Sequence, residues 1–129
     1  MRKVVSTHTP SEERVGYSRA VVIDETRIYF SGTTSQDEKG EIIGDDVYSQ
    51  SKNIFSKITS VVNSEGFKIG DTVLVRAYLV DITQIEGFDK AFGEAFKQTK
   101  PACTLVGINQ LIDPKMLIEI ELIAEKSGK

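Results

Sequence analysis

The chain has 129 residues, of which 40% are hydrophobic and 27% charged, and this balance predicts one soluble domain spanning residues 1–129. The same balance excludes an intrinsically disordered protein. The longest apolar runs have only a few residues, whereas a membrane-spanning helix needs about 20, so we expect no such helix. The single cysteine, Cys103, can form no internal disulfide, which favours a reducing, cytoplasmic location.

Acidic and basic residues are nearly balanced and are spread along the whole chain. Sixteen Lys and Arg against nineteen Asp and Glu give a net charge of −3. Proteins that hold nucleic acid usually carry a basic surface, so the charge pattern argues against nucleic acid as a partner.

The first half of the chain predicts a hairpin, a loop and a helix. Two β-rich runs, 20–23 and 27–31, flank Asp24-Glu25-Thr26 and are typical of a β-hairpin, and Val4-Val5 suggests a further strand. The segment 33–46 is rich in Gly, Asp, Ser and Thr and predicts a loop. A helix is expected from Asp46 to Gly66, because apolar residues recur at a spacing of about 3.6: Val47, Ile54, Ile58, Val61 and Val62.

The second half predicts a strand, a helix and two more strands. Residues 72–80 alternate between two mostly apolar faces, with Val73, Val75, Ala77 and Leu79 on one of them. A helix after Asp81 places Ile85, Phe88, Phe92 and Phe96 on one face, which we interpret as a core stripe. Strands are expected at 103–108 and 117–124. The order ββ-α-β-α-ββ indicates an α+β fold with two helices on one face of the sheet.

Such a sheet has one face without helices to cover it. The strand 72–80 and the last strand are rich in apolar residues, so we expect the uncovered face to meet another subunit. A homotrimer would let three sheets close around a common core.

Few residues in this chain are candidates for chemistry. Glu119 and Glu121 share one face of the last strand, where they either lie in solvent or line a cleft that makes one of them a general acid or base. His8 is the only histidine, so no zinc site is expected. Ser31-Gly32 ends a strand and either forms a plain turn or lets a ligand approach the backbone. No phosphate-binding glycine motif is present, and we expect no cofactor.

Six segments resemble, in order, the motifs of the Rid family, also called YjgF/RidA or endoribonuclease L-PSP. They are Gly16-Tyr17-Ser18-Arg19-Ala20-Val21, Ile28-Tyr29-Phe30-Ser31-Gly32, Gly66-Phe67-Lys68-Ile69-Gly70-Asp71-Thr72-Val73, Tyr78-Leu79-Val80-Asp81, Pro101-Ala102-Cys103-Thr104 and Ile118-Glu119-Ile120-Glu121-Leu122-Ile123-Ala124. Together they cover nearly the whole chain.

The resemblance implies the chorismate-mutase-like (ferredoxin-like) fold and a homotrimer that binds a small metabolite in clefts between subunits. It also implies hydrolysis of reactive imines and enamines, such as 2-iminobutanoate, to keto acids and ammonia. On this basis Glu119 would act on water, while Tyr17, Ser31 and Gly32 would line the cleft.

The chain departs from the family pattern at its carboxylate-binding arginine, which is Cys103 here. Thr33 also replaces a glutamine and Lys57 a helix asparagine. A thiol lacks both the charge and the two-pronged fork of a guanidinium. Either Arg19 or Lys100 would then supply a substitute cation, or the protein would bind a metabolite without turnover. For Cys103 itself we favour a small buried apolar side chain over a nucleophile.

Overall fold

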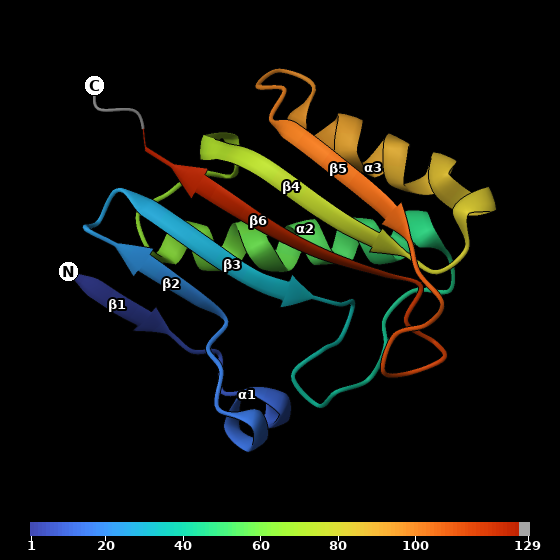
Figure 1. The fold of residues 1–129 in the computed structure, drawn as a ribbon, viewed down its shortest axis with the longest axis horizontal. Helices are drawn as coiled ribbons and strands as arrows, with labels where there is room; N and C mark the ends of the chain where they lie inside the picture. Colours follow the sequence, from blue (N-terminus) through green and yellow to red (C-terminus); the bar gives the residue numbers. More distant parts are fainter. Residues whose placement is uncertain (127–129) are drawn as a thin grey trace.

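The computed structural model describes residues 1–126, which form a six-stranded sheet and two long helices (Figure 1). The elements in chain order are β1 (Arg2–Val5), α1 (Pro10–Val15), β2 (Ala20–Ile23), β3 (Arg27–Thr33), α2 (Val47–Ser64), η1 (Ile69–Asp71), β4 (Thr72–Leu79), η2 (Ile82–Gln84), α3 (Ile85–Phe96), β5 (Ala102–Gly107) and β6 (Ile118–Glu125). The expected strands and the two long helices are all present, and most of their ends lie within two residues of those expected. The helix expected after Asp81 begins later, at Ile85, because the short helix η2 precedes it.

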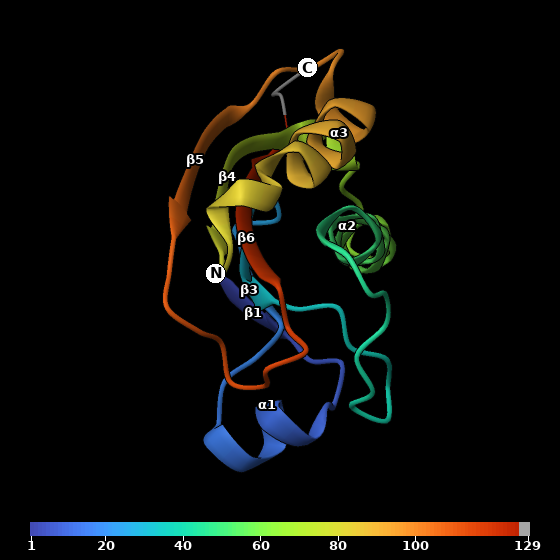
Figure 2. The ribbon, with the colours of Figure 1, turned by 90° about the vertical axis from the view of Figure 1, so that its right-hand side faces the viewer.

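The strands lie in the order β1-β2-β3-β6-β4-β5, and every neighbouring pair is antiparallel except β4 and β5. The last strand of the chain therefore lies between β3 and β4, in the middle of the sheet. Helices α2 and α3 both cover one face, and the other face is open (Figure 2). The predicted α+β fold with two helices on one face is confirmed.

The core lies between the sheet and the two long helices. The apolar stripe of α2 is buried at Val47, Ile54, Ile58 and Val62. The expected aromatic face of α3 packs there too: the rings of Phe55 and Phe96 meet edge to face with centroids 5.3 Å apart. The interpretation of this face as a core stripe is confirmed.

The open face exposes several apolar side chains. Tyr29 and Val73 are each 43% exposed, whereas Val75, Ala77 and Leu79 are buried under the helices. We had expected Val73 to share the face of Val75. That expectation was wrong, because the pairing of β4 with β6 shifts register between Thr72 and Leu74.

A buried glutamine fixes the start of β6. Gln50 of α2 is 1% exposed, its amide nitrogen donates to the carbonyls of Gly44 and Lys115, and its oxygen accepts from the backbone N–H of Leu117. Because a buried amide is costly unless it is paired, these bonds hold the turn before β6 against the helix. They thereby set the position of Glu119, two residues further on.

None of the helices in residues 1–126 is long and apolar enough to cross a membrane.

Candidate functional site

A cavity of about 530 Å³ opens at the end of the sheet where β3 ends and β6 begins. Its walls come from the segment that includes α1, the loop after β3, one face of α2 and the turn before β6. Tyr17, Arg19, Gly32, Lys57 and Glu119 all line it. The topology thus brings four of the six predicted site residues to one cavity, and adds a lysine that was not among them.

Helix α1 forms because its first residues cap it. Thr9 is the N-cap and its side chain accepts from the backbone N–H of Glu12, while Pro10 occupies the first turn, where it needs no hydrogen-bond donor. Gly16 ends the helix with φ 95°, a left-handed conformation that favours glycine. This short helix lies beside the end of the sheet, below β2 in the view of Figure 1.

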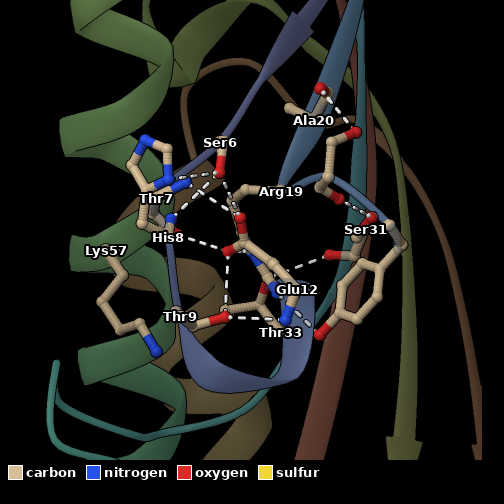
Figure 3. Close-up of polar contacts among 12 residues, drawn as sticks. Ser6, Thr7, His8, Thr9, Glu12, Arg19, Ala20, Ser31, Thr33 and Lys57 are labelled. Carbon is tan, nitrogen blue, oxygen red and sulfur yellow. Dashed lines mark hydrogen bonds and ion pairs between the residues drawn. The ribbon is translucent and has the colours of Figure 1, made fainter. Parts of the chain in front are cut away.

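The carboxylate of Glu12 organises the segment in front of α1. Glu12 is 3% exposed and accepts hydrogen bonds from Ser6, from both the backbone and the side chain of Thr7, and from Thr9 (Figure 3). Burial raises its pKa, but the bonds from Thr7 and Ser6 and the charge of Arg19 outweigh burial and lower the pKa to about 2. Glu12 is therefore a buried anion at neutral pH.

Arg19 is the cation that faces Glu12. Its Nε donates to Glu12 across 3.3 Å, and its side chain is 11% exposed. One terminal nitrogen donates to the Gly32 carbonyl and to the Thr33 hydroxyl, both at 2.9 Å, and the other donates to the Tyr17 hydroxyl at 3.1 Å. Four of its five N–H groups are thus used within the described residues.

This geometry argues against Arg19 as the substitute cation that binds a carboxylate. Its charge is matched by Glu12, and only one N–H remains for a ligand, so Arg19 cannot grip a carboxylate with two parallel bonds. Instead it ties α1, β2 and β3 together and holds Tyr17 against the cavity. Lys100, the other substitute that we considered, does not line this cavity.

Glu119 lies half-buried beside Gly32. A Cβ atom placed on Gly32 would come within 2.5 Å of the Glu119 carboxylate, so only glycine leaves room for it there. Burial raises the pKa of Glu119, the nearby Arg19 opposes this, and the like charge of Glu121 adds to it. The net result is a carboxyl group with a raised pKa that faces the cavity, as a general base requires.

Glu121 has a different environment although it lies on the same strand face. It accepts hydrogen bonds from Arg76 and from the Tyr78 hydroxyl on β4, and it is outside the cavity. Of the two carboxylates, only Glu119 lines the cleft.

Lys57 extends from α2 toward the group of residues around Glu12 and Arg19 (Figure 3). Its ammonium donates to the carbonyl of Thr34 at 2.8 Å. Burial and the charge of Arg19 lower its pKa to about 8, and Asp37 opposes this only in part. Lys57 is thus a half-buried cation on the cavity wall.

Two predicted site residues point elsewhere within a single chain. Ser31 donates to the carbonyl of Ser18 and does not line the cavity. Cys103 lies on β5, at the edge of the sheet, and is exposed, so the expectation of a buried apolar side chain was wrong for one chain. Burial of part of its surface and the charge of Asp89 raise the pKa of its thiol, which disfavours a thiolate nucleophile.

Sequence reasoning missed α1 and Glu12 and assigned Lys57 no role in the site, although each had a signal. Thr9-Pro10-Ser11-Glu12 has the spacing of a helix N-terminus, with a capping threonine and an acidic residue three positions later. Gln50, Ile54 and Lys57 are spaced four and three residues apart and therefore share one face of the helix. Lys57 is a charged residue on this otherwise buried face. A charge on such a stripe marks a cavity or a buried partner.

Substituting Gly32 with alanine should displace the Glu119 carboxylate. The backbone of Gly32 does not have the left-handed conformation that excludes other residues, so the methyl group would push only the end of a flexible side chain. If Glu119 acts on substrate, turnover by Gly32→Ala should fall by about 10-fold or more, while the melting temperature changes by only a few degrees. Unchanged turnover would show that the position of this carboxylate does not matter.

Comparison with known proteins agrees with the fold. The family described as Endoribonuclease L-PSP matches residues 7–126, and the chain belongs to this family. A RutC family protein of Pyrococcus horikoshii is 30% identical over 128 residues, which are 98% of this chain and 99% of the relative. The human 2-iminobutanoate/2-iminopropanoate deaminase is 28% identical over 126 residues, covering 96% of this chain and 90% of that protein.

Solved structures show the same architecture. A Mycobacterium tuberculosis protein, described as a member of the highly conserved YjgF/YER057c/UK114 family, superposes with a TM-score of 0.88 at 31% identity. The match covers 98% of this chain and 100% of that one. The Rid-type fold that the six motifs predicted is therefore confirmed.

Proposed function

We propose that this protein hydrolyses small, reactive imines or enamines to the corresponding carbonyl compounds and ammonia. The observation that carries the proposal is Glu119, a half-buried carboxylate whose pKa is raised by burial and which faces a 530 Å³ cavity. Cavities of this size suit small metabolites. The deaminase name of the human relative supports the choice of reaction.

The reaction needs a base beside an electrophilic carbon. In a protonated imine the carbon of the C=N bond is attacked by water, and Glu119 takes one proton from that water as the C–O bond forms. The resulting carbinolamine then receives the proton on nitrogen, the C–N bond breaks and ammonia leaves. Loss of the hydroxyl proton completes the carbonyl group.

The other cavity residues would position the substrate. Tyr17 is held by Arg19 with a hydrogen bond of 3.1 Å, and the guanidinium carbon lies 5.4 Å from the centre of its ring. This contact fixes an aromatic side chain in the wall of the cavity that Glu119 also lines. The backbone at Gly32 lets the substrate approach Glu119 without a side chain in between.

We further propose a homotrimer with clefts between subunits. The open sheet face exposes apolar side chains such as Tyr29 and Val73. In the sheet that residues 1–126 form, β5 is an edge strand that pairs only with β4. Assembly could bring Cys103 of one chain to the cavity of another. A sedimentation experiment at micromolar concentration that finds only monomers would contradict this arrangement.

The activity test measures keto acid and ammonia released from freshly generated imines, with and without the protein. A panel should include imines with a carboxylate, such as 2-iminobutanoate, and neutral ones. We expect the protein to increase the rate of release at least with one class. Rates equal to spontaneous decay for every member of the panel would contradict the proposed hydrolysis.

A second candidate function is metabolite binding without turnover. Cys103 favours it, because an exposed thiol with a raised pKa supplies no charge where the family has an arginine. This function predicts thermal stabilisation by a metabolite that is recovered unchanged.

A further inference from the structure

Lys57 carries a charge that residues 1–126 do not neutralise. Its one hydrogen bond there is to the carbonyl of Thr34, and it is absent from the ion pairs that these residues form. The other buried cation of the site, Arg19, has a full partner in Glu12. A partly buried ammonium that lacks a paired anion is unfavourable, and two of its N–H groups remain for a ligand.

The acidic side chain that acts on the pKa of Lys57 is not arranged to neutralise it. Asp37 lines the cavity, but its carboxylate accepts hydrogen bonds from the backbone N–H groups of Lys39 and Glu41 and so serves the turn of its own loop. Its charge raises the pKa of Lys57 less than burial and Arg19 lower it. The cavity therefore has a place where an incoming anion would be favoured.

We propose that Lys57 binds the carboxylate of an anionic substrate, so that the cation comes from α2 of the same chain that supplies Glu119. The substrate class in this inference, a 2-imino acid, rests on the proposed hydrolysis. Lys57 would take the role of the family's carboxylate-binding arginine, which is Cys103 in this chain. Lysine holds a carboxylate as a point charge, whereas arginine binds it through a two-pronged fork. We therefore expect weaker discrimination among carboxylate orientations than an arginine would give.

The test uses binding, so that it does not depend on turnover. Calorimetric titration compares 2-oxobutanoate, the stable product of 2-iminobutanoate hydrolysis, with the neutral 2-oxobutanamide. Wild-type protein should bind the acid at least 10-fold more tightly than the amide. Lys57→Gln should weaken binding of the acid by about 10- to 100-fold and leave binding of the amide unchanged.

Two control variants separate a ligand-binding role from a structural one. Lys52→Gln removes a charge from the same helix, where Lys52 pairs with Glu94 outside the cavity, and should not change either affinity. Lys57→Arg should keep the preference for the acid. Because Lys57 forms no ion pair with the rest of residues 1–126, Lys57→Gln should also melt within a few degrees of wild type.

Several results would overturn the inference. They are equal binding of acid and amide by wild type, no binding of either compound, or a Lys57→Gln variant that binds the acid as wild type does. If Lys57→Gln did not fold, equal binding of acid and amide by wild type would still contradict the inference. If the acid binds through Lys57 but no imine is hydrolysed, the anion site stands and the proposed hydrolysis fails.

Discussion

Glu119→Gln should reduce imine hydrolysis by about 10²- to 10⁴-fold while the protein still binds the keto acid product. Glutamine has nearly the same shape as glutamate but cannot accept a proton from water. Glu119 faces the cavity, and no hydrogen bond from residues 1–126 contributes to its pKa. Its replacement should therefore not disturb the fold. The measurement is kcat for keto acid release, together with a thermal melt of each protein.

Glu121→Gln provides the matched control. Glu121 is two residues away on the same strand face, but it bonds to Arg76 and Tyr78 and lies outside the cavity. Turnover by Glu121→Gln should stay within a few fold of wild type. An equal loss of turnover in both variants would mean that turnover depends on the negative charge of β6 and not on Glu119 in particular. Full activity in Glu119→Gln would exclude Glu119 from the mechanism.

Glu12→Gln should destabilise the folded protein by about 3–5 kcal/mol, because it leaves the buried guanidinium of Arg19 without its anion. The side chains of Glu12 and Arg19 are only 1% and 11% exposed, so water cannot replace the lost charge. Denaturant unfolding monitored by circular dichroism measures the change. Glu13→Gln is the control. Among residues 1–126 Glu13 pairs with the exposed His8, so this substitution should change stability by about 0.5 kcal/mol or less.

The same pair predicts how stability depends on pH. The folded-state pKa of Glu12 is about 2, below its ordinary value of 4.5, so the stabilisation is fully present above pH 4.5 and is lost as pH falls toward 2. The shift corresponds to about 3 kcal/mol. Wild type should lose this stability in acid, whereas Glu12→Gln should lack that part of the pH dependence. Parallel acid profiles for the two proteins would contradict the assignment.

The buried ion pair with Glu12 explains why Arg19 cannot take the role of the family's carboxylate-binding arginine, which is Cys103 here. Arg19 is in the cavity wall, close enough to Glu119 to affect its pKa, and by position alone it would be the natural substitute for the arginine that Cys103 replaces. Its hydrogen bonds show that it is already used to hold α1 and β3 together. A pair of this kind stabilises the site and leaves the recognition of an anion to Lys57.

The sequence by itself determined the fold class and the strand that carries the candidate catalytic glutamate, Glu119. Periodicity located both long helices, the hairpin and the central strands, because each has a face that must be buried. The motif around Glu119 and its match to a known family gave the reaction to consider. The alternation along the last strand placed Glu119 and Glu121 together on one face, but it could not say which of them meets a cavity.

Only the tertiary structure decided which charges are matched and which are not. Glu12 and Arg19 are seven residues apart, and nothing in their spacing shows that one neutralises the other in a buried pair. Lys57 joins them from a helix 38 residues beyond Arg19. Whether a charge is neutralised or buried depends on distances between elements that are far apart in the sequence. Sequence patterns indicate only which residues share a face of one element. For this reason the fold could be derived from the sequence, whereas the cation available to a ligand could not.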